Sequence, residues 1–117
     1  MAIVISESLS ATPNTTTLPK RITLRQKLIS NQTSEKVQFH YTLNPDHDIW
    51  FKKADGTLLK AVQRSGVAAK TVKEFSHRIT LVRNGGNSFS GTLIINQTII
   101  DESNNKLADL VTIIVKR

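Results

Sequence analysis

The alternation of apolar and polar residues in short runs constrains this chain more than any other feature, because a period of two suits a β-strand and not a helix. In residues 37–43 every second side chain is apolar. In the last third of the chain, Phe89–Ile100 and Leu107–Val115 are two apolar runs on either side of a six-residue polar loop. This arrangement predicts an antiparallel hairpin.

The predicted hairpin carries apolar residues on both of its faces. Leu93 and Ile95 fall on one face, whereas Ile94, Ile100 and Ile114 fall on the other. A strand that is covered on one side only shows a cleaner alternation. We therefore expect the protein core on one side of the hairpin and a second contact, such as another subunit, on the other.

The middle of the chain predicts further strands. Apolar residues alternate over 22–28, and Asp55-Gly56 separates two apolar runs, which is a strong hairpin signal. Residues 71–82 predict one or two strands, and Arg64–Lys70 predicts either a loop or one helical turn. Together these patterns predict about seven or eight short antiparallel strands, closed as a sandwich or a barrel, with no long helix.

The N-terminal residues 1–19 differ in composition from the rest of the chain. A short apolar piece, Ala2, Ile3, Val4 and Ile5, precedes a stretch rich in Ser, Thr, Pro and Asn. We interpret 1–19 as an extended arm or linker and 20–117 as the β-sandwich domain. The apolar piece can pair as an edge strand with its own sheet or with that of a neighbour, and we expect neither a signal peptide nor a transmembrane helix.

Positive charge is concentrated in one segment of a chain with a formal charge of +7. Residues 52–83 contain eight Lys and Arg against two acidic residues. One interpretation is a surface that docks on an acidic partner; the other is a set of solvated loops and edge strands, where Lys discourages unwanted pairing. The candidate docking cations are Lys52, Lys53, Lys60, Arg64, Lys70 and Lys73.

The sequence offers little catalytic chemistry. It has no cysteine, and the carboxylates at 46–48 and 101–105 suit Asx turns that satisfy their own backbone better than a metal site. Gly86–Gly91 has the wrong glycine spacing for a serine nucleophile elbow. We expect no enzyme activity, no metal and no cofactor. Aromatic residues make up only 5% of the chain, which disfavours nucleic acid as a partner.

Residues 20–117 resemble an immunoglobulin-like β-sandwich. The resemblance rests on Leu24 and Leu28, on the alternating run at 37–41, on Trp50 in the next strand, and on the closing hairpin. The chain lacks the cysteine pair and the tyrosine near the start of the penultimate strand that true immunoglobulin domains contain.

A basic, cysteine-free sandwich with a Ser/Thr/Pro-rich arm is similar to the capsid decoration, or cement, proteins of tailed phages. This resemblance implies a homo-oligomer, a dimer or a trimer, on the surface of a virion. The implied partner is the major capsid protein or another acidic lattice, and no membrane is involved. The partner-binding residues would be Ala2 to Ile5, the six cations named above, and Ile94, Ile100 and Ile114.

The alternative is an immunoglobulin-like or fibronectin-like binding module of an adhesin or carbohydrate-active protein, at a bacterial cell surface or secreted. In that case Trp50 would contact the ligand, for example by stacking on a sugar ring.

Overall fold

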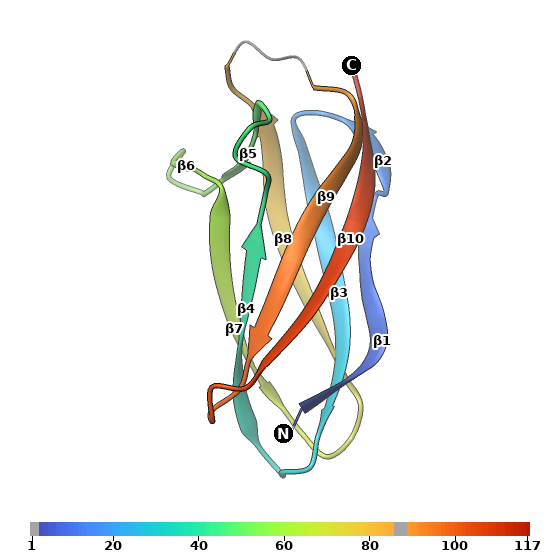
Figure 1. The fold of residues 1–117 in the computed structure, drawn as a ribbon, viewed down its shortest axis with the longest axis vertical. Coiled ribbons are helices and arrows are strands. Elements are labelled where there is room, and N and C mark those ends of the chain that lie inside the picture. The colour runs from blue at the N-terminus through green and yellow to red at the C-terminus, as the bar shows by residue number, and fades with distance from the viewer. Residues whose placement is uncertain (1–2, 86–88) are drawn as a thin grey trace.

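Two five-stranded sheets stack face to face and contain all the strands of the described chain (Figure 1). A computed structural model describes residues 3–85 and 89–117. The strands are β1 Ile3–Thr12, β2 Thr15–Thr17, β3 Lys20–Ser30, β4 Glu35–Thr42, β5 Ile49–Lys52, β6 Leu58–Leu59, β7 Ala61–Ala68, β8 Lys73–Arg83, β9 Gly91–Ile100 and β10 Lys106–Lys116. The order is β1-β3-β8-β5-β6 in sheet A and β2-β10-β9-β4-β7 in sheet B. This confirms the predicted all-β sandwich, with ten strands where seven or eight were expected and with one parallel pair, β2 and β10.

Sheet A and sheet B share one core between their inner faces. Strand alternation turns every second side chain of each strand inward, and the largest fully buried side chains include Tyr41, Phe39 and Phe51. A buried hydrogen bond between side chains crosses this core: the Gln97 amide in β9 donates to Gln26 Oε1 in β3 at 2.7 Å. A buried amide pair of this kind specifies how the two sheets are aligned.

The closing hairpin forms as predicted. Strands β9 and β10 pair antiparallel from Gly91 opposite Val115 to Ile100 opposite Lys106. The loop between them is an Asx turn, in which Asp101 Oδ1 accepts hydrogen bonds from the backbone N–H groups of Ser103 and Asn105 at 2.9 Å. The carboxylate of this loop is therefore used by its own backbone.

Most of the predicted arm belongs to the sandwich. Strand β1 pairs antiparallel with β3, from Ile3 opposite Ser30 to Thr12 opposite Thr23, and β2 then pairs in parallel with the end of β10. Ile3 and Leu9 are buried in the core. The apolar piece therefore pairs with its own subunit, and Ala2 lies outside the described residues.

The segment after the Asp-Gly turn differs from its prediction. The turn forms, with Gly56 in the left-handed region at a φ of 90°, but the hairpin is short because β6 has only two residues. The chain then crosses to sheet B as β7, so the loop or helical turn predicted for Arg64–Lys70 is wrong over most of its length. Small residues suit this strand: a β-carbon on Gly66 would lie 2.6 Å from Phe75 Cε1.

Within 3–85 and 89–117 there is no helix long and apolar enough to cross a membrane.

Candidate functional site

A groove lined by five positive side chains opens at one side of the sandwich. Its volume is about 660 Å³, and it is lined by Arg21, Lys52, Lys53, Ala54, Arg64, Arg78, Ile79 and Thr80. We call this the cationic groove. Among the described residues no carboxylate lines it, so the groove concentrates charge of one sign.

Strand register brings these cations together from four segments. Lys52 of β5 pairs with Thr80 of β8, and Thr80 pairs with Arg21 of β3, so the three lie in one row across sheet A. Arg78 precedes Thr80 by two residues and therefore lies on the same outer face. Arg64 comes from β7, the edge strand of sheet B. The groove forms because the short β5 pairs only with Thr80–Arg83, which leaves the earlier part of β8 without a neighbour on that side.

None of the five groove cations has an ion-pair partner among residues 3–85 and 89–117. The three ion pairs found there are Arg25–Glu74, Lys27–Glu7 and Arg83–Asp48. Arg64 Nη1 donates to the carbonyl of Gln63 at 2.9 Å, which leaves its other donors for a ligand. Three guanidinium groups suit oxyanions, because each can donate two parallel hydrogen bonds to a carboxylate, sulfate or phosphate.

Arg64 also acts on the core. The pKa of His77 is lowered to about 4, mainly by burial and to a smaller extent by the positive charge of Arg64. His77 Nδ1 lies 2.8 Å from the Tyr41 hydroxyl, which is itself buried. The imidazole is therefore neutral at pH 7, and it lies half-buried with its Nδ1 already paired to the tyrosine.

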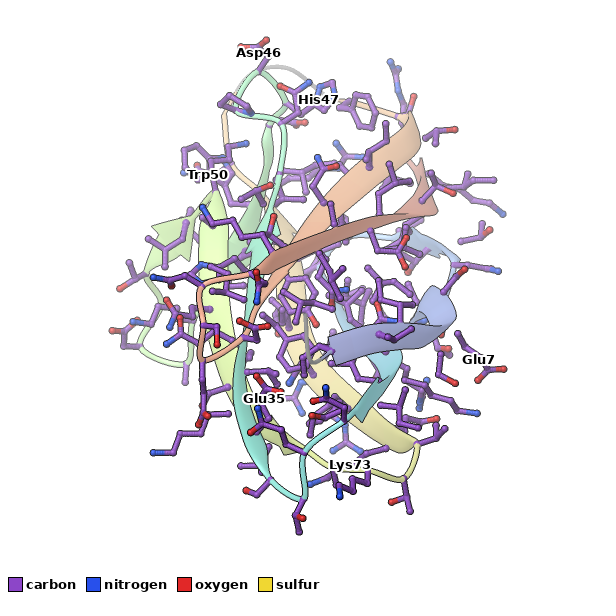
Figure 2. The ribbon with its side chains drawn as sticks, turned by 60° about the horizontal axis from the view of Figure 1, so that its bottom comes forward. Glu7, Glu35, Asp46, His47, Trp50 and Lys73 are labelled. Carbon is purple, nitrogen blue, oxygen red and sulfur yellow. The ribbon has the colours of Figure 1, made fainter. Side chains whose placement is uncertain are left out.

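The structure gathers three of the six predicted docking cations and separates the others. Lys52, Lys53 and Arg64 line the cationic groove. Lys70 is exposed in the connection between β7 and β8. Lys73 lies at the far end of the sandwich from His47 (Figure 2), where its ammonium donates to the carbonyl of Val67 at 2.9 Å. Partner binding by these residues stays a prediction.

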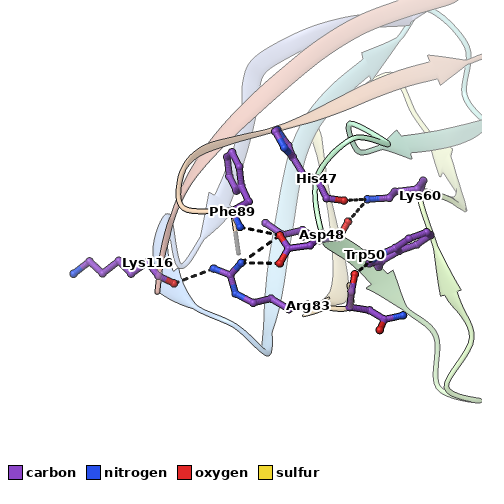
Figure 3. A network of polar contacts seen from close by, with 9 residues as sticks. His47, Asp48, Trp50, Lys60, Arg83, Phe89 and Lys116 are labelled. Atoms are coloured by element: carbon purple, nitrogen blue, oxygen red, sulfur yellow. Dashed lines mark hydrogen bonds and ion pairs between the residues drawn. The ribbon is translucent and has the colours of Figure 1, made fainter. Parts of the chain in front are cut away.

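Lys60 is occupied inside its own chain. Its ammonium donates to the carbonyls of His47 at 2.7 Å, Ile49 at 2.6 Å and Asn44 at 3.3 Å (Figure 3). It also lies 4.2 Å from the centre of the Trp50 ring. Burial lowers the pKa of Lys60, and the negative charges of Asp48 and Asp46 partly offset this decrease. All three donors of the ammonium have an acceptor, so Lys60 holds the loop before β5.

A second network anchors the same end of the sandwich (Figure 3). Asp48 is buried; it accepts from Phe89 N at 3.0 Å and pairs with Arg83 at 3.3 Å. Burial alone would raise the pKa of Asp48, but these contacts outweigh it and hold the pKa below its usual range. The His47 ring stacks on Phe89 at a centroid distance of 3.9 Å. The carboxylates at 46–48 are thus part of a folded loop, and no group of three or more metal-ligating side chains occurs in the described residues.

Trp50 is partly exposed on β5, and its indole N–H is already hydrogen-bonded. Its indole N–H donates to the carbonyl of Asn84 at 3.1 Å, and the Lys60 ammonium lies over its ring. Trp50 does not line the cationic groove.

The remaining predicted residues lie apart from the groove. Ile3 is buried, Ile5 is half-buried, and Val4 is exposed on β1. Ile94 and Ile114 are exposed on the outer face of sheet B, and Ile100 is half-buried there. Residues 86–88 of the serine-elbow candidate, Ser88 included, lie outside the described residues.

The sequence alone did not single out Arg21 and Arg78. Each alternates with buried residues along its strand, which is the signal for an outward position. Which strands lie next to each other depends on sheet order, and the local pattern does not specify it.

Comparison with known proteins identifies the fold and no family. No protein-family model matches the chain, and no curated protein matches it. Among solved structures, it is similar to the alkylpurine DNA glycosylase AlkC of Pseudomonas fluorescens bound to DNA containing an abasic site analogue, with a TM-score of 0.62 and 16% identity over 99% of this chain and 31% of that one. It is also similar to the sporulation control protein of Bacillus subtilis, with a TM-score of 0.60 and 8% identity over 100% of this chain and 50% of that one.

A third similar structure is the cupredoxin domain of amoB from Nitrosocaldus yellowstonii, with a TM-score of 0.50 and 9% identity over 99% of this chain and 88% of that one. The chain spans about a third of the length of the DNA glycosylase and about half of the length of the sporulation control protein. At these identities the likeness concerns the fold alone, because one sandwich architecture serves many functions.

Proposed function

We propose that this protein is a non-enzymatic structural component of a large assembly, which docks on an acidic protein surface through the cationic groove. The acidic lattice of a viral capsid is the partner that the sequence resemblance suggests. In this role the protein is a decoration or cement protein at the surface of a virion.

The observation that carries the proposal is the set of five cations without ion-pair partners in one groove. Charges held without partners favour an oppositely charged surface and speed its approach. In the part of the chain that the structure describes, no aromatic side chain lines the groove, so it offers no platform for stacking bases. Binding of carboxylates on a protein surface requires positive charge and guanidinium groups that can donate paired hydrogen bonds, and the groove supplies both.

The binding-module alternative depends on Trp50, and the contacts of Trp50 do not favour it. A sugar-binding tryptophan offers a free ring face and a free indole N–H, whereas the Lys60 ammonium covers one face of this ring at 4.2 Å and the N–H is already donated to Asn84.

A carboxylate polymer tests the proposal directly. Poly-L-glutamate binding is measured by fluorescence anisotropy for the wild type and for the triple variant Arg21→Gln, Arg64→Gln, Arg78→Gln. The matched control, Lys36→Gln, Lys106→Gln, Lys116→Gln, loses the same charge from sheet B. Three exposed ion pairs at about 0.7 kcal/mol each predict a loss of about 30-fold for the groove variant and less than about twofold for the control.

Other outcomes overturn the proposal. Equal losses in both variants would mean that net charge alone drives binding. Tighter binding of a DNA duplex than of poly-L-glutamate would replace the acidic protein with nucleic acid as the partner. A change in Trp50 fluorescence with an oligosaccharide, unaffected by salt, would favour the binding module.

A further inference from the structure

The outer face of sheet B has almost no charge. On strands β9 and β10, three apolar side chains, Ile94, Leu110 and Ile114, are exposed to 46%, 50% and 49%. Their cross-strand partners are Thr112, Asn96 and Thr92. We call these six residues and the uncharged side chains around them the neutral face. The charged residues that point outward from sheet B are Lys36, Lys106 and Lys116, each at an end of its strand.

We propose that the neutral face is a homodimer interface, which packs against the same face of a second copy of this chain. The dimer itself does not depend on the function proposed above. Its consequence for docking, two cationic grooves on one particle, does rest on that function.

Charge favours a second copy as the occupant. The chain carries a net charge of +7, and sheet A presents Arg21, Lys52 and Arg78 without ion pairs on the opposite side of the sandwich. Two copies repel each other through that side, whereas the neutral face brings few like charges together. An acidic partner, in contrast, gains most at the cationic groove and little at the neutral face.

The pattern of the neutral face suits a two-fold contact. Ile94 lies opposite Thr112, and Leu110 lies opposite Asn96 on the neighbouring strand, so large apolar and smaller polar side chains alternate between β9 and β10. A two-fold rotation can place the apolar side chains of one copy in the gaps of the other. Aligned packing of two β-sheets with interdigitated side chains is the usual geometry for such faces.

The available area is sufficient. Sheet B runs along the long axis of the molecule (Figure 1), whose extents are 47 × 24 × 21 Å. A standard stable interface buries about 800 Å² on each partner, which a face of this length and width can supply.

The dimer would turn the protein into a bridge. The outer faces of the two sheets of a sandwich point in opposite directions, so packing through sheet B leaves both copies of sheet A outward. Two grooves held at a fixed spacing bind a repeating acidic surface more tightly than one groove does. A dimer would therefore stabilise a lattice even where each groove binds it weakly.

Sedimentation equilibrium of the full chain tests the dimer. The wild type is compared with the double variant Ile94→Lys, Leu110→Lys, and with the matched control Val72→Lys, Ser76→Lys, which places the same two charges at exposed positions off the neutral face. We expect twice the 13.0 kDa chain mass for the wild type and the control. In the neutral-face variant the dimer dissociation constant should rise by at least about 100-fold, because like charges then face each other across the two-fold axis.

Salt separates this inference from the proposed function. The dimer should persist or tighten as ionic strength rises, while binding of poly-L-glutamate should weaken. The groove variant should remain a dimer. A monomeric wild type, a dimer that survives in the neutral-face variant, or a dimer lost equally in the control would each overturn the inference, whatever the outcome of the poly-L-glutamate experiment. Circular dichroism of each variant checks that it is folded.

Discussion

The outer faces of the two sheets are built on the same strand alternation and yet present opposite surfaces. Sheet A exposes Arg21, Arg78 and Lys52, together with the ion pairs Arg25–Glu74 and Lys27–Glu7. The central part of sheet B exposes Thr, Asn, Ala, Ile and Leu. Both sheets bury the same kind of core. The inward-facing apolar residues therefore specify the fold. The outward-facing residues are not constrained by the core, so one sheet can expose charged side chains and the other uncharged ones.

The first test of this comparison separates cations that dock from cations that hold the fold. Lys60→Met should lower the free energy of unfolding by about 2–3 kcal/mol, because three backbone carbonyls lose a charged donor. Its affinity for poly-L-glutamate should stay within about twofold of the wild type. Urea unfolding and fluorescence anisotropy measure the two effects.

The matched variant is Lys53→Met in the cationic groove. It should lower poly-L-glutamate affinity and leave the urea midpoint unchanged, since no hydrogen bond or ion pair in the described chain involves the Lys53 ammonium. If Lys60→Met lost affinity as strongly as Lys53→Met, Lys60 would belong to the docking surface.

The second test follows the link between the cationic groove and the core. The pKa of His77 is lowered to about 4 by burial and by Arg64, against an ordinary value of 6.5. Between these two values the unfolded chain binds a proton that the folded chain does not. The free energy of unfolding should therefore fall as the pH drops from 6.5 toward 4, by about 1–2 kcal/mol after allowance for solvent screening of a half-exposed ring.

Urea unfolding at pH 7 and pH 4.5 measures this loss, and His77→Gln should remove most of it. Arg64→Gln should raise the pKa of His77, as followed by NMR titration. An unchanged pKa in Arg64→Gln would show that the groove charge does not reach the core.

The smallest expected effect concerns the paired cations of sheet A. The Lys27 ammonium lies 2.6 Å from a Glu7 carboxylate oxygen, and the hydrogen bond that it donates to this carboxylate, followed by the carboxylate's negative charge, raises the pKa of Lys27. The pair is solvent-exposed, so Lys27→Gln should leave the thermal midpoint unchanged within experimental error. It should also leave poly-L-glutamate affinity nearly unchanged, because Lys27 does not line the groove. A loss as large as that of Arg78→Gln would extend the docking surface along β3.

Local patterns were sufficient to predict several elements. The alternation at 37–43 predicts β4, the two apolar runs predict the β9–β10 hairpin, and Asp55-Gly56 predicts the turn between β5 and β6. Strand β7 was missed because Ser65-Gly66-Val67-Ala68 lacks large apolar side chains. The glycine in this stretch is explained by the Phe75 ring, which packs against Gly66.

The N-terminal stretch shows a similar limit. Its composition predicts an arm, yet Ile3–Thr12 pairs with β3 over ten residues. Backbone pairing depends little on side-chain type, so a polar strand can complete a sheet edge. Whether residues 1–19 can be removed without loss of the fold or of the dimer stays a prediction, which the solution mass of a chain beginning at Lys20 would test.

The sequence by itself determined the all-β class, the face on which each strand buries its side chains, and the excess of positive charge, because all three depend on residue identity and a period of two. The tertiary structure decided which cations meet. Arg21, Lys52, Arg64 and Arg78 lie on four different strands, and only the strand order and register bring them to one groove. It also decided that Lys60 is held by three carbonyls, since those acceptors belong to a loop more than ten residues away in the chain.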